Sequence, residues 1–180
     1  MSPRYVPSPL APVSAEERDG RWTLVFTRVL RHPPDRVWSA LTDPAELAHW
    51  APFDADRDLG ATGEAALTMA GSPPGEQETL KSQVRIAERP RVLEYTWGDD
   101  VLRWELEPLG TGTKLVLHHS VTDRDWGPKV AAGWHICLDV AERMMDGDPV
   151  GRVVGDDARK FGWEQLNDQY AARLGVASTG

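Results

Sequence analysis

The segment from Pro33 to Trp50 constrains the fold of this chain more than any other part of its sequence. Two of its prolines, Pro34 and Pro44, stand where a helix can begin, because proline fits the first turn of a helix but interrupts the interior of one. Asp43 directly precedes the second of these prolines and can cap a helix, with Glu46 as the acidic partner of a capping box. The segment therefore predicts two short helices that meet at a sharp corner.

Both predicted helices carry one apolar face. Val37, Trp38 and Leu41 are spaced by three and four residues in the first helix. Leu47 and Trp50 repeat that kind of spacing in the second helix, and such spacing places side chains on one side of a helix. We therefore expect both helices to pack onto a larger element of the chain.

The residues that follow have the pattern of an antiparallel meander. From residue 54 to residue 122, strand-like runs alternate with turn signals rich in Gly, Pro and Asp. Within 93–97 and 102–106, large apolar residues occupy every second position, so each strand has one covered side and one solvent side. The segment Gly127–Met145 has helical apolar spacing and is the predicted cover. These patterns predict an α+β fold in which a long helix lies in the palm of a curved sheet.

Three motifs occur in a fixed order along the chain: Leu-Thr-Asp-Pro at 41–44, a strand-like run ending in His-His at 113–119, and Gly-Trp at 133–134. Together they resemble the family of homologues of the heat-shock protein 90 ATPase activator, within the START and birch-pollen-allergen superfamily, also called SRPBCC. The resemblance implies the helix-grip fold, a curved antiparallel meander wrapped round a long C-terminal helix, with two short helices after the first strand. It also implies an apolar small molecule held between the sheet and that helix.

The predicted domain organisation is simple. Residues 1–18 carry four prolines and are expected to form a flexible, proline-rich tail, and residues 19–180 are expected to form one START-like domain. A chain of 180 residues is long enough to bury on the order of 70% of the surface that its unfolded form exposes. A last helix is expected at about 162–174, where Trp163, Leu166 and Tyr170 share one face.

Composition limits the partners and the location that we expect. The chain has 20 Lys and Arg against 28 Asp and Glu, which argues against nucleic acid because phosphate binding needs gathered cations. No uncharged apolar run approaches the roughly 20 residues of a membrane-spanning helix, so we expect a soluble, cytoplasmic protein. The single cysteine, Cys137, lies in an apolar helical pattern and is interpreted as a small buried hydrophobe. The oligomeric state stays open, a homodimer included.

The candidate ligand-binding residues are those predicted to face the space between the meander and the long helix. Trp and Tyr suit either a core or the wall of a ligand site, and both interpretations stay open. A histidine there, His119, could orient a carbonyl or a carboxylate, act as an acid or base near neutral pH, or be a core histidine. The full set is Trp50, Tyr95, Trp97, Trp104, His119, Trp134, His135 and Leu138.

The candidates for catalysis are His119, His135 and Asp139. The last two are four residues apart on the long helix, so the carboxylate could fix the imidazole tautomer, or the two could form a plain surface pair. Patterns typical of zinc sites, phosphate loops and nucleophile elbows do not occur. The run Asp146–Gly151 echoes a calcium loop only superficially. We therefore expect no metal and no cofactor.

The sequence leads to one function hypothesis and two alternatives. We expect binding of a small hydrophobic or aromatic molecule, because the predicted inner face is rich in Trp and poor in ionisable groups. The alternative is an enzyme of the cyclase, hydratase or hydrolase kind that uses a pocket histidine, although no set of residues demands catalysis. A co-chaperone that contacts a heat-shock protein is disfavoured, because the resemblance covers only the C-terminal type of domain.

Overall fold

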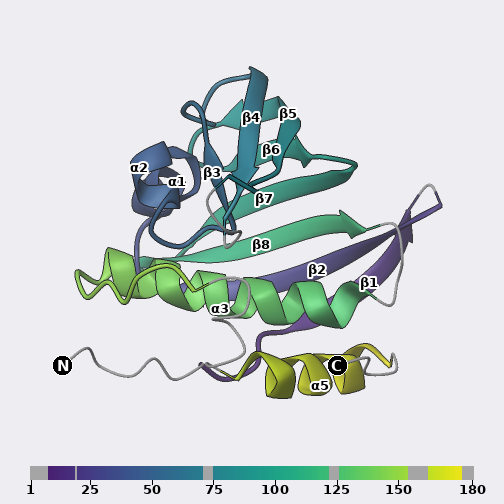
Figure 1. Cartoon of the computed structure of the whole chain (residues 1–180). Coiled ribbons are helices and arrows are strands. Elements are labelled where there is room, and N and C mark those ends of the chain that lie inside the picture. Colours follow the sequence, from purple (N-terminus) through teal and green to yellow (C-terminus); the bar gives the residue numbers. More distant parts are fainter. Residues whose placement is uncertain (1–7, 19, 71–74, 122–125, 154–161, 176–180) are drawn as a thin grey trace.

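The computed structural model describes residues 8–18, 20–70, 75–121, 126–153 and 162–175. The strands in this part of the chain form one antiparallel sheet in the order β1-β2-β8-β7-β6-β5-β4-β3 (Figure 1). The strands are β1 (Val13–Arg18), β2 (Arg21–Leu30), β3 (Phe53–Ala55), β4 (Gly63–Met69), β5 (Thr79–Glu88), β6 (Val92–Trp97), β7 (Asp100–Leu109) and β8 (Gly112–Val121). The helices are α1 (Pro34–Thr42), α2 (Pro44–Leu47), α3 (Gly127–Met145) and α5 (Trp163–Leu174). The predicted α+β helix-grip fold is confirmed.

Helices α1 and α2 form the predicted corner. Each has proline in its first turn, and Asp43 accepts a hydrogen bond of 2.9 Å from a backbone N–H in the first turn of α2. The capping box does not form, since the Glu46 carboxylate pairs with Arg36 of α1 instead. Trp50 donates from Nε1 to the carbonyl of Ala40 at 2.9 Å. Side chains of both helices therefore hold the corner together.

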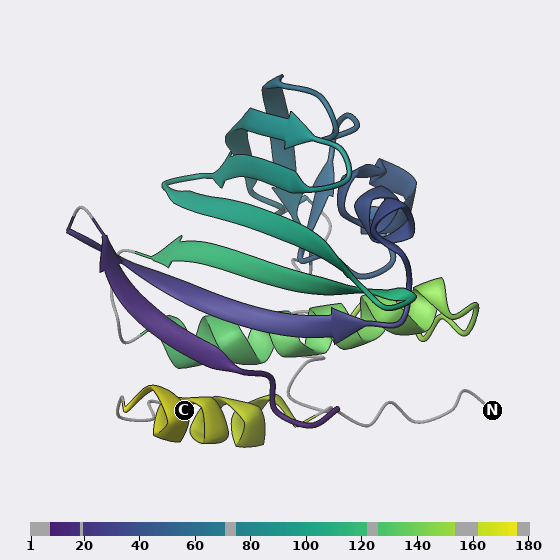
Figure 2. The ribbon, with the colours of Figure 1, turned by 180° about the vertical axis from the view of Figure 1, so that it is seen from behind.

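Helix α3 lies across the concave face of the sheet, as Figure 1 shows, and Figure 2 gives the view from behind, with the sheet in front of α3. The strands alternate in burial as predicted. On β7, Leu102, Trp104 and Leu106 are buried, whereas Arg103 and Glu105 between them are partly exposed. Because successive side chains of a strand point to opposite faces, the buried set lies on the side that α3 covers. The core therefore lies between the concave face and α3.

The N-terminal residues differ from the flexible tail expected over residues 1–18. Val13–Arg18 form β1, an edge strand that pairs antiparallel with β2. The prediction of a tail, which rested on the prolines, is wrong for residues 13–18. The last proline, Pro12, precedes the strand, and its carbonyl accepts a hydrogen bond of 3.0 Å from Thr27 of β2. Proline lacks only the donor of the backbone pair. Residues 1–7 lie outside the described residues.

Helix α5 runs over Trp163–Leu174, where the last helix was expected. It lies beside α3 in both views of the ribbon (Figure 1, Figure 2). Its buried side includes Leu166 and Tyr170, and the Tyr170 ring lies 6.0 Å from the ring of Phe26 on β2. Helix α5 therefore covers the end of the sheet that β1 and β2 form.

Candidate functional site

The predicted ligand-binding aromatics pack together between the sheet and α3. The Trp104 ring lies 5.3 Å from the ring of Trp134 on α3 and 6.3 Å from that of Trp50. Its Nε1 donates to the Tyr95 hydroxyl at 3.3 Å. These four side chains are at most 3% exposed, and Leu138, one turn after Trp134, is also buried. The centre of this group is therefore closed to solvent.

Trp97 differs from these four because it is half-buried at the end of β6. Its ring lies 5.2 Å from that of Phe53, 5.8 Å from that of His119 and 6.1 Å from that of Trp134. Its indole N–H points to the thioether sulfur of Met69 at 3.3 Å, and a thioether is a weak acceptor. Trp97 thus marks the end at which the group meets solvent, and it completes what we call the aromatic cluster: Trp50, Tyr95, Trp97, Trp104 and Trp134.

His119 of β8 is held at both ring nitrogens. Trp134 Nε1 donates to its Nδ1 at 2.9 Å, so the neutral ring carries its proton on Nε2, which lies 2.7 Å from Asp100 Oδ2. The His119 side chain is 2% exposed, whereas that of Asp100 is 32% exposed and lies 3.8 Å from the guanidinium of Arg21. The arrangement fixes the orientation of the ring. Proton transfer by His119 would require one of the two bonds to break.

His135 and Asp139 lie away from the aromatic cluster, on the side of α3 that faces α5. His135 Nδ1 lies 2.6 Å from the Tyr170 hydroxyl, and its Nε2 lies 3.4 Å from Asp139. The Tyr170 hydroxyl also accepts from the backbone N–H of Ala11 at 3.0 Å, which leaves its own proton for His135 Nδ1. His135 is 0% exposed and Asp139 4% exposed. They are therefore a buried polar pair and not a surface pair.

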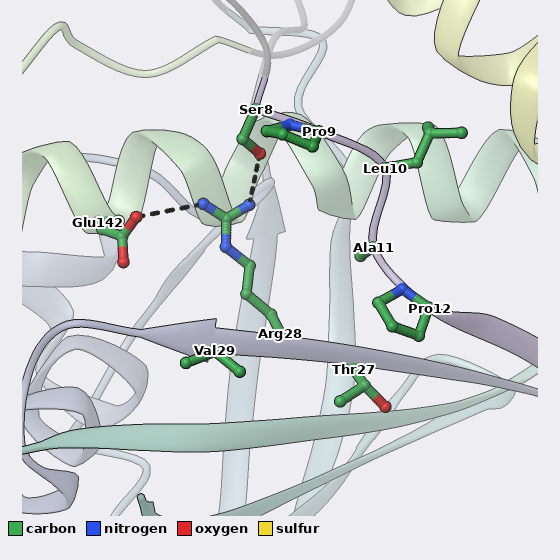
Figure 3. A pocket seen from close by; sticks show the side chains of 9 residues that line it. All are labelled: Ser8, Pro9, Leu10, Ala11, Pro12, Thr27, Arg28, Val29 and Glu142. Atoms are coloured by element: carbon green, nitrogen blue, oxygen red, sulfur yellow. Dashed lines mark hydrogen bonds and ion pairs between the residues drawn. The ribbon is translucent and has the colours of Figure 1, made fainter. Parts of the chain in front are cut away.

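A pocket of about 270 Å³ lies beside this pair, between the segment 8–12 and β2 (Figure 3). The guanidinium of Arg28, which projects from β2, forms an ion pair with Asp139 and lies 3.4 Å from Glu142 and 3.3 Å from Ser8 Oγ. Ser8 in turn donates its backbone N–H and its hydroxyl to Asp139 at 2.9 and 2.6 Å. The rest of the lining is mainly apolar, with Pro9, Leu10, Ala11, Pro12, Thr27 and Val29. The charges at this pocket are thus already paired, and Ser8 anchors the N-terminal segment across α3.

Burial sets the ionisation of several groups in the interior. It raises the pKa of the Tyr95 hydroxyl by more than the hydrogen bond with Trp104 lowers it. It raises the pKa of Cys137 to about 12, against the lowering effect of the charge of Arg152, which agrees with the prediction of a small buried hydrophobe. Burial also raises the pKa of the Tyr170 hydroxyl. All three groups are therefore protonated at neutral pH.

The acids of the predicted calcium-like run take part in ion pairs. Asp146 pairs with Arg31 at 2.6 Å and with His32 at 2.7 Å, and Asp148 pairs with Arg143 at 2.6 Å. In the part of the chain that the structure describes, no three His, Cys, Asp or Glu side chains gather closely enough to hold a metal ion. Within the same residues, no helix combines the length and the apolar character needed to cross a membrane.

Sequence reasoning missed two residues that complete the polar networks, Arg28 and Asp100. Arg28 has the same strand parity as Leu24 and Phe26 on β2, so its position predicts an inward side chain. A buried guanidinium needs a carboxylate partner. That signal was present in the sequence. Asp100 shares the inward parity of Leu102 and Trp104 on β7, but its contact with His119 depends on the pairing of β7 with β8, which local sequence does not show.

Comparison with solved structures finds the same fold in proteins of low sequence identity. The crystal structure of CalU16 from Micromonospora echinospora is 20% identical, with a TM-score of 0.65, and the match covers 90% of this chain and 95% of that one. A conserved protein of unknown function from Enterococcus faecalis, EF2215, is 19% identical, with a TM-score of 0.66 and 89% of each chain covered. The AHSA1-like protein from Aeromonas hydrophila is 18% identical, with a TM-score of 0.59, and the match covers 69% of this chain and 92% of that one. These likenesses show the fold alone.

The sequence itself matches a family model. None of the curated proteins compared with it matches. The model described as "Activator of Hsp90 ATPase homolog 1-like protein" matches residues 31–146, from the start of the α1–α2 corner to the end of α3. Proteins of this fold family commonly bind hydrophobic ligands. The chain belongs to the family of activator of Hsp90 ATPase homolog 1-like proteins.

Proposed function

We propose that this protein binds a small hydrophobic or aromatic molecule between the curved sheet and α3, at the end of the aromatic cluster where Trp97 lies. The observation that carries the proposal is the half-buried state of Trp97, the one member of the aromatic cluster that is more than slightly exposed. An exposed edge on an otherwise closed aromatic wall gives an apolar molecule a place to make its first contacts.

The side chains around Trp97 support this location. Met69 bonds to the Trp97 indole, and Leu80 lies against Gly98, the next residue of the chain. Val130 precedes Trp134 by about one turn of α3. Met69, Leu80 and Val130 are all half-buried. Apolar side chains of this kind around Trp97 are the lining that a hydrophobic ligand needs.

Binding requires some aromatic side chains to move, because the centre of the cluster is packed. An edge-to-face ring pair is worth about 0.5–1.5 kcal/mol beyond its buried area, so the loss of two such contacts costs roughly 1–3 kcal/mol. A ligand that buries on the order of 100 Å² of apolar surface gains about 2.5 kcal/mol. A two-ring ligand buries more than this, so its apolar burial is at least comparable with the loss of those two ring contacts.

The polar groups near the cluster favour binding over catalysis. Both ring nitrogens of His119 already have partners. His135 and Asp139 lie on the other side of α3, against α5 and Ser8. None of the three predicted catalytic groups therefore has a ring nitrogen or carboxylate oxygen that is free to exchange a proton with a ligand between the sheet and α3.

A thermal-shift and native mass spectrometry screen of lipids, polyketides and aromatic metabolites tests the proposal. A ligand at 100 times its Kd stabilises the protein by about 2.7 kcal/mol, which raises Tm by about 5–11 °C for a chain of this length. We expect Trp97→Ala to lose most of this shift. Trp163→Ala is the matched control, because Trp163 is also half-buried but lies in α5. A screen that yields neither a shift nor a bound mass would contradict the proposal.

A further inference from the structure

We infer that the ligand of this protein carries a hydrogen-bond acceptor, a carbonyl or ether oxygen on an apolar or aromatic body, and that Ser82 and Tyr95 bind this oxygen. The inference rests on the proposed function and adds the chemical class of the ligand. Its basis is a group of hydrogen-bond donors on the inner face of β5 and β6 that lack oxygen acceptors.

Ser82 is the clearest member of this group. It is 5% exposed, and its hydroxyl has no hydrogen-bond partner. Ser82 lies two residues from Leu80 and two from Val84 on β5, and Val84 is fully buried. Residues two apart on a strand lie on the same face, so Ser82 points inward with them. A buried hydroxyl left unpaired is unfavourable, and native proteins retain few such groups without a reason such as a bound molecule.

Tyr95 and Trp97 point inward from the neighbouring strand β6, and each also has a hydrogen-bond donor without an oxygen acceptor. The Tyr95 hydroxyl accepts from Trp104 Nε1 at 3.3 Å, and its own proton has no acceptor among the described residues. Burial raises the pKa of this hydroxyl, so it keeps that proton. The Trp97 N–H has the thioether of Met69 as its acceptor, which is weaker than any oxygen.

The strand register brings these donors together. Val84 of β5 lies opposite Tyr95 of β6 in an antiparallel pair, so Ser82, two residues before Val84 on the same face, lies diagonally across from Tyr95. Diagonal neighbours of this kind lie about 7–8 Å apart, still within reach of an aromatic side chain. On the other side, Ser82 pairs with Ala65 of β4, another small residue. A ligand oxygen near Ser82 is thus within reach of donors from both strands.

The surroundings indicate a neutral acceptor. The inward positions of β4, β5 and β6 hold no Lys or Arg in the described residues, so a carboxylate or phosphate would be buried there without a counter-charge, which is costly. A pure hydrocarbon would leave the donors unpaired. His119 and Trp134 do not compete for the ligand, because they bond to each other. A carbonyl or ether oxygen meets both conditions.

A matched pair of probes, 1-tetralone and tetralin, tests the inference by calorimetry or tryptophan fluorescence. The two molecules share a two-ring frame, and only tetralone has the carbonyl. We expect wild type to bind tetralone more tightly than tetralin. Ser82→Ala and Tyr95→Phe should each weaken tetralone binding about five- to tenfold, the size of one hydrogen bond, with tetralin binding unchanged. Ser120→Ala is the control, because Ser120 alternates with buried residues and lies on the outer side of β8.

The possible failures are distinguishable. If both probes bind and Ser82→Ala weakens them equally or leaves both unchanged, the acceptor subsite is refuted while the ligand site stands. A rise in Tm of Ser82→Ala with an unchanged ratio of the two affinities would identify the hydroxyl as an unpaired core group and would also refute it. If wild type binds tetralin alone, or neither probe, the inference is overturned. The proposed function falls as well only if the wider screen finds no ligand.

Discussion

Replacement of Asp139 by alanine should destabilise this protein far more than most single substitutions do. The Asp139 side chain is 5% exposed and accepts from the guanidinium of Arg28 and from two donors of Ser8. Alanine removes the carboxylate and leaves the Arg28 side chain, which is only 9% exposed, with Glu142 at 3.4 Å as the remaining carboxylate of the described residues. A buried cation then lacks its closest counter-charge.

The size of the loss follows from that geometry. Removal of one partner of a buried ion pair costs about 3–5 kcal/mol, a large part of the roughly 5–15 kcal/mol that stabilises a typical domain. Because Glu142 retains some of the pairing, we expect a loss near the lower end, about 3 kcal/mol. In a chain of this length, that loss lowers Tm by about 6–12 °C.

Urea unfolding followed by circular dichroism measures the loss. The double variant Arg28→Met/Asp139→Leu should regain part of the stability, because it removes the unpaired cation, while the donors of Ser8 and His135 still lack the Asp139 carboxylate. Asp148→Ala is the surface control: Asp148 is 58% exposed in its pair with Arg143, and such pairs contribute at most about 1 kcal/mol. An Asp139→Ala loss no larger than that of the control, or a double variant as unstable as the single one, would refute the argument.

Three further predictions concern ionisation. The His119 ring should be the Nε2–H tautomer, because Trp134 donates to Nδ1; the ¹⁵N shifts of the ring measure this, and an Nδ1–H signal would contradict it. Cys137 should resist the thiol reagent DTNB at about pH 8, since burial raises its pKa to about 12 and the thiolate is the reactive form; fast labelling of the folded protein would count against this. Burial acts to raise the pKa of Glu105, but hydrogen bonds from His118 and a neighbouring guanidinium outweigh it and lower that pKa from 4.5. A lowered carboxylate pKa stabilises the fold above the pKa of the unfolded chain, and this stability is lost as the pH falls through the folded value. The stability difference between wild type and Glu105→Gln should therefore be present above pH 4.5 and shrink below it; a difference that does not change with pH would show that the pair is not formed.

The fold could be predicted where it depends on local patterns. The helix predicted over Gly127–Met145 has the bounds of α3, because its apolar spacing is read from neighbouring residues alone. The α1–α2 corner followed from prolines and a capping Asp43. Strand β1 was missed because its existence depends on pairing with β2, and the local signal, a run of prolines, favoured a tail. Long-range pairing is the information that the local pattern lacks.

Only part of the candidate site could be predicted, because its polar contacts also depend on long-range pairing. Strand alternation placed His119 on the inner face, where it is buried, but its partner Asp100 could not be found without the sheet register. His135 was grouped with Trp134, although neighbours on a helix point about 100° apart. Helical geometry therefore directs Trp134 to the sheet and His135 to Tyr170 of α5. The aromatic residues and the inward direction of Arg28 were accessible to sequence reasoning, whereas the contacts of His119 with Asp100 and of His135 with Tyr170 were not.

The residues of α3 explain why this chain needs more than the part that matches the family model. Every residue from Trp134 to Ala141 is buried, and eight consecutive residues span more than two turns, so this part of α3 is covered on all sides. The sheet covers one side only. Helix α5 and the segment at Ser8, both outside the matched residues 31–146, cover the other, and they supply the partners of His135 and Asp139. A buried imidazole and carboxylate without those partners would be strongly unfavourable, so the sequence of α3 is adapted to a fold that includes both terminal elements.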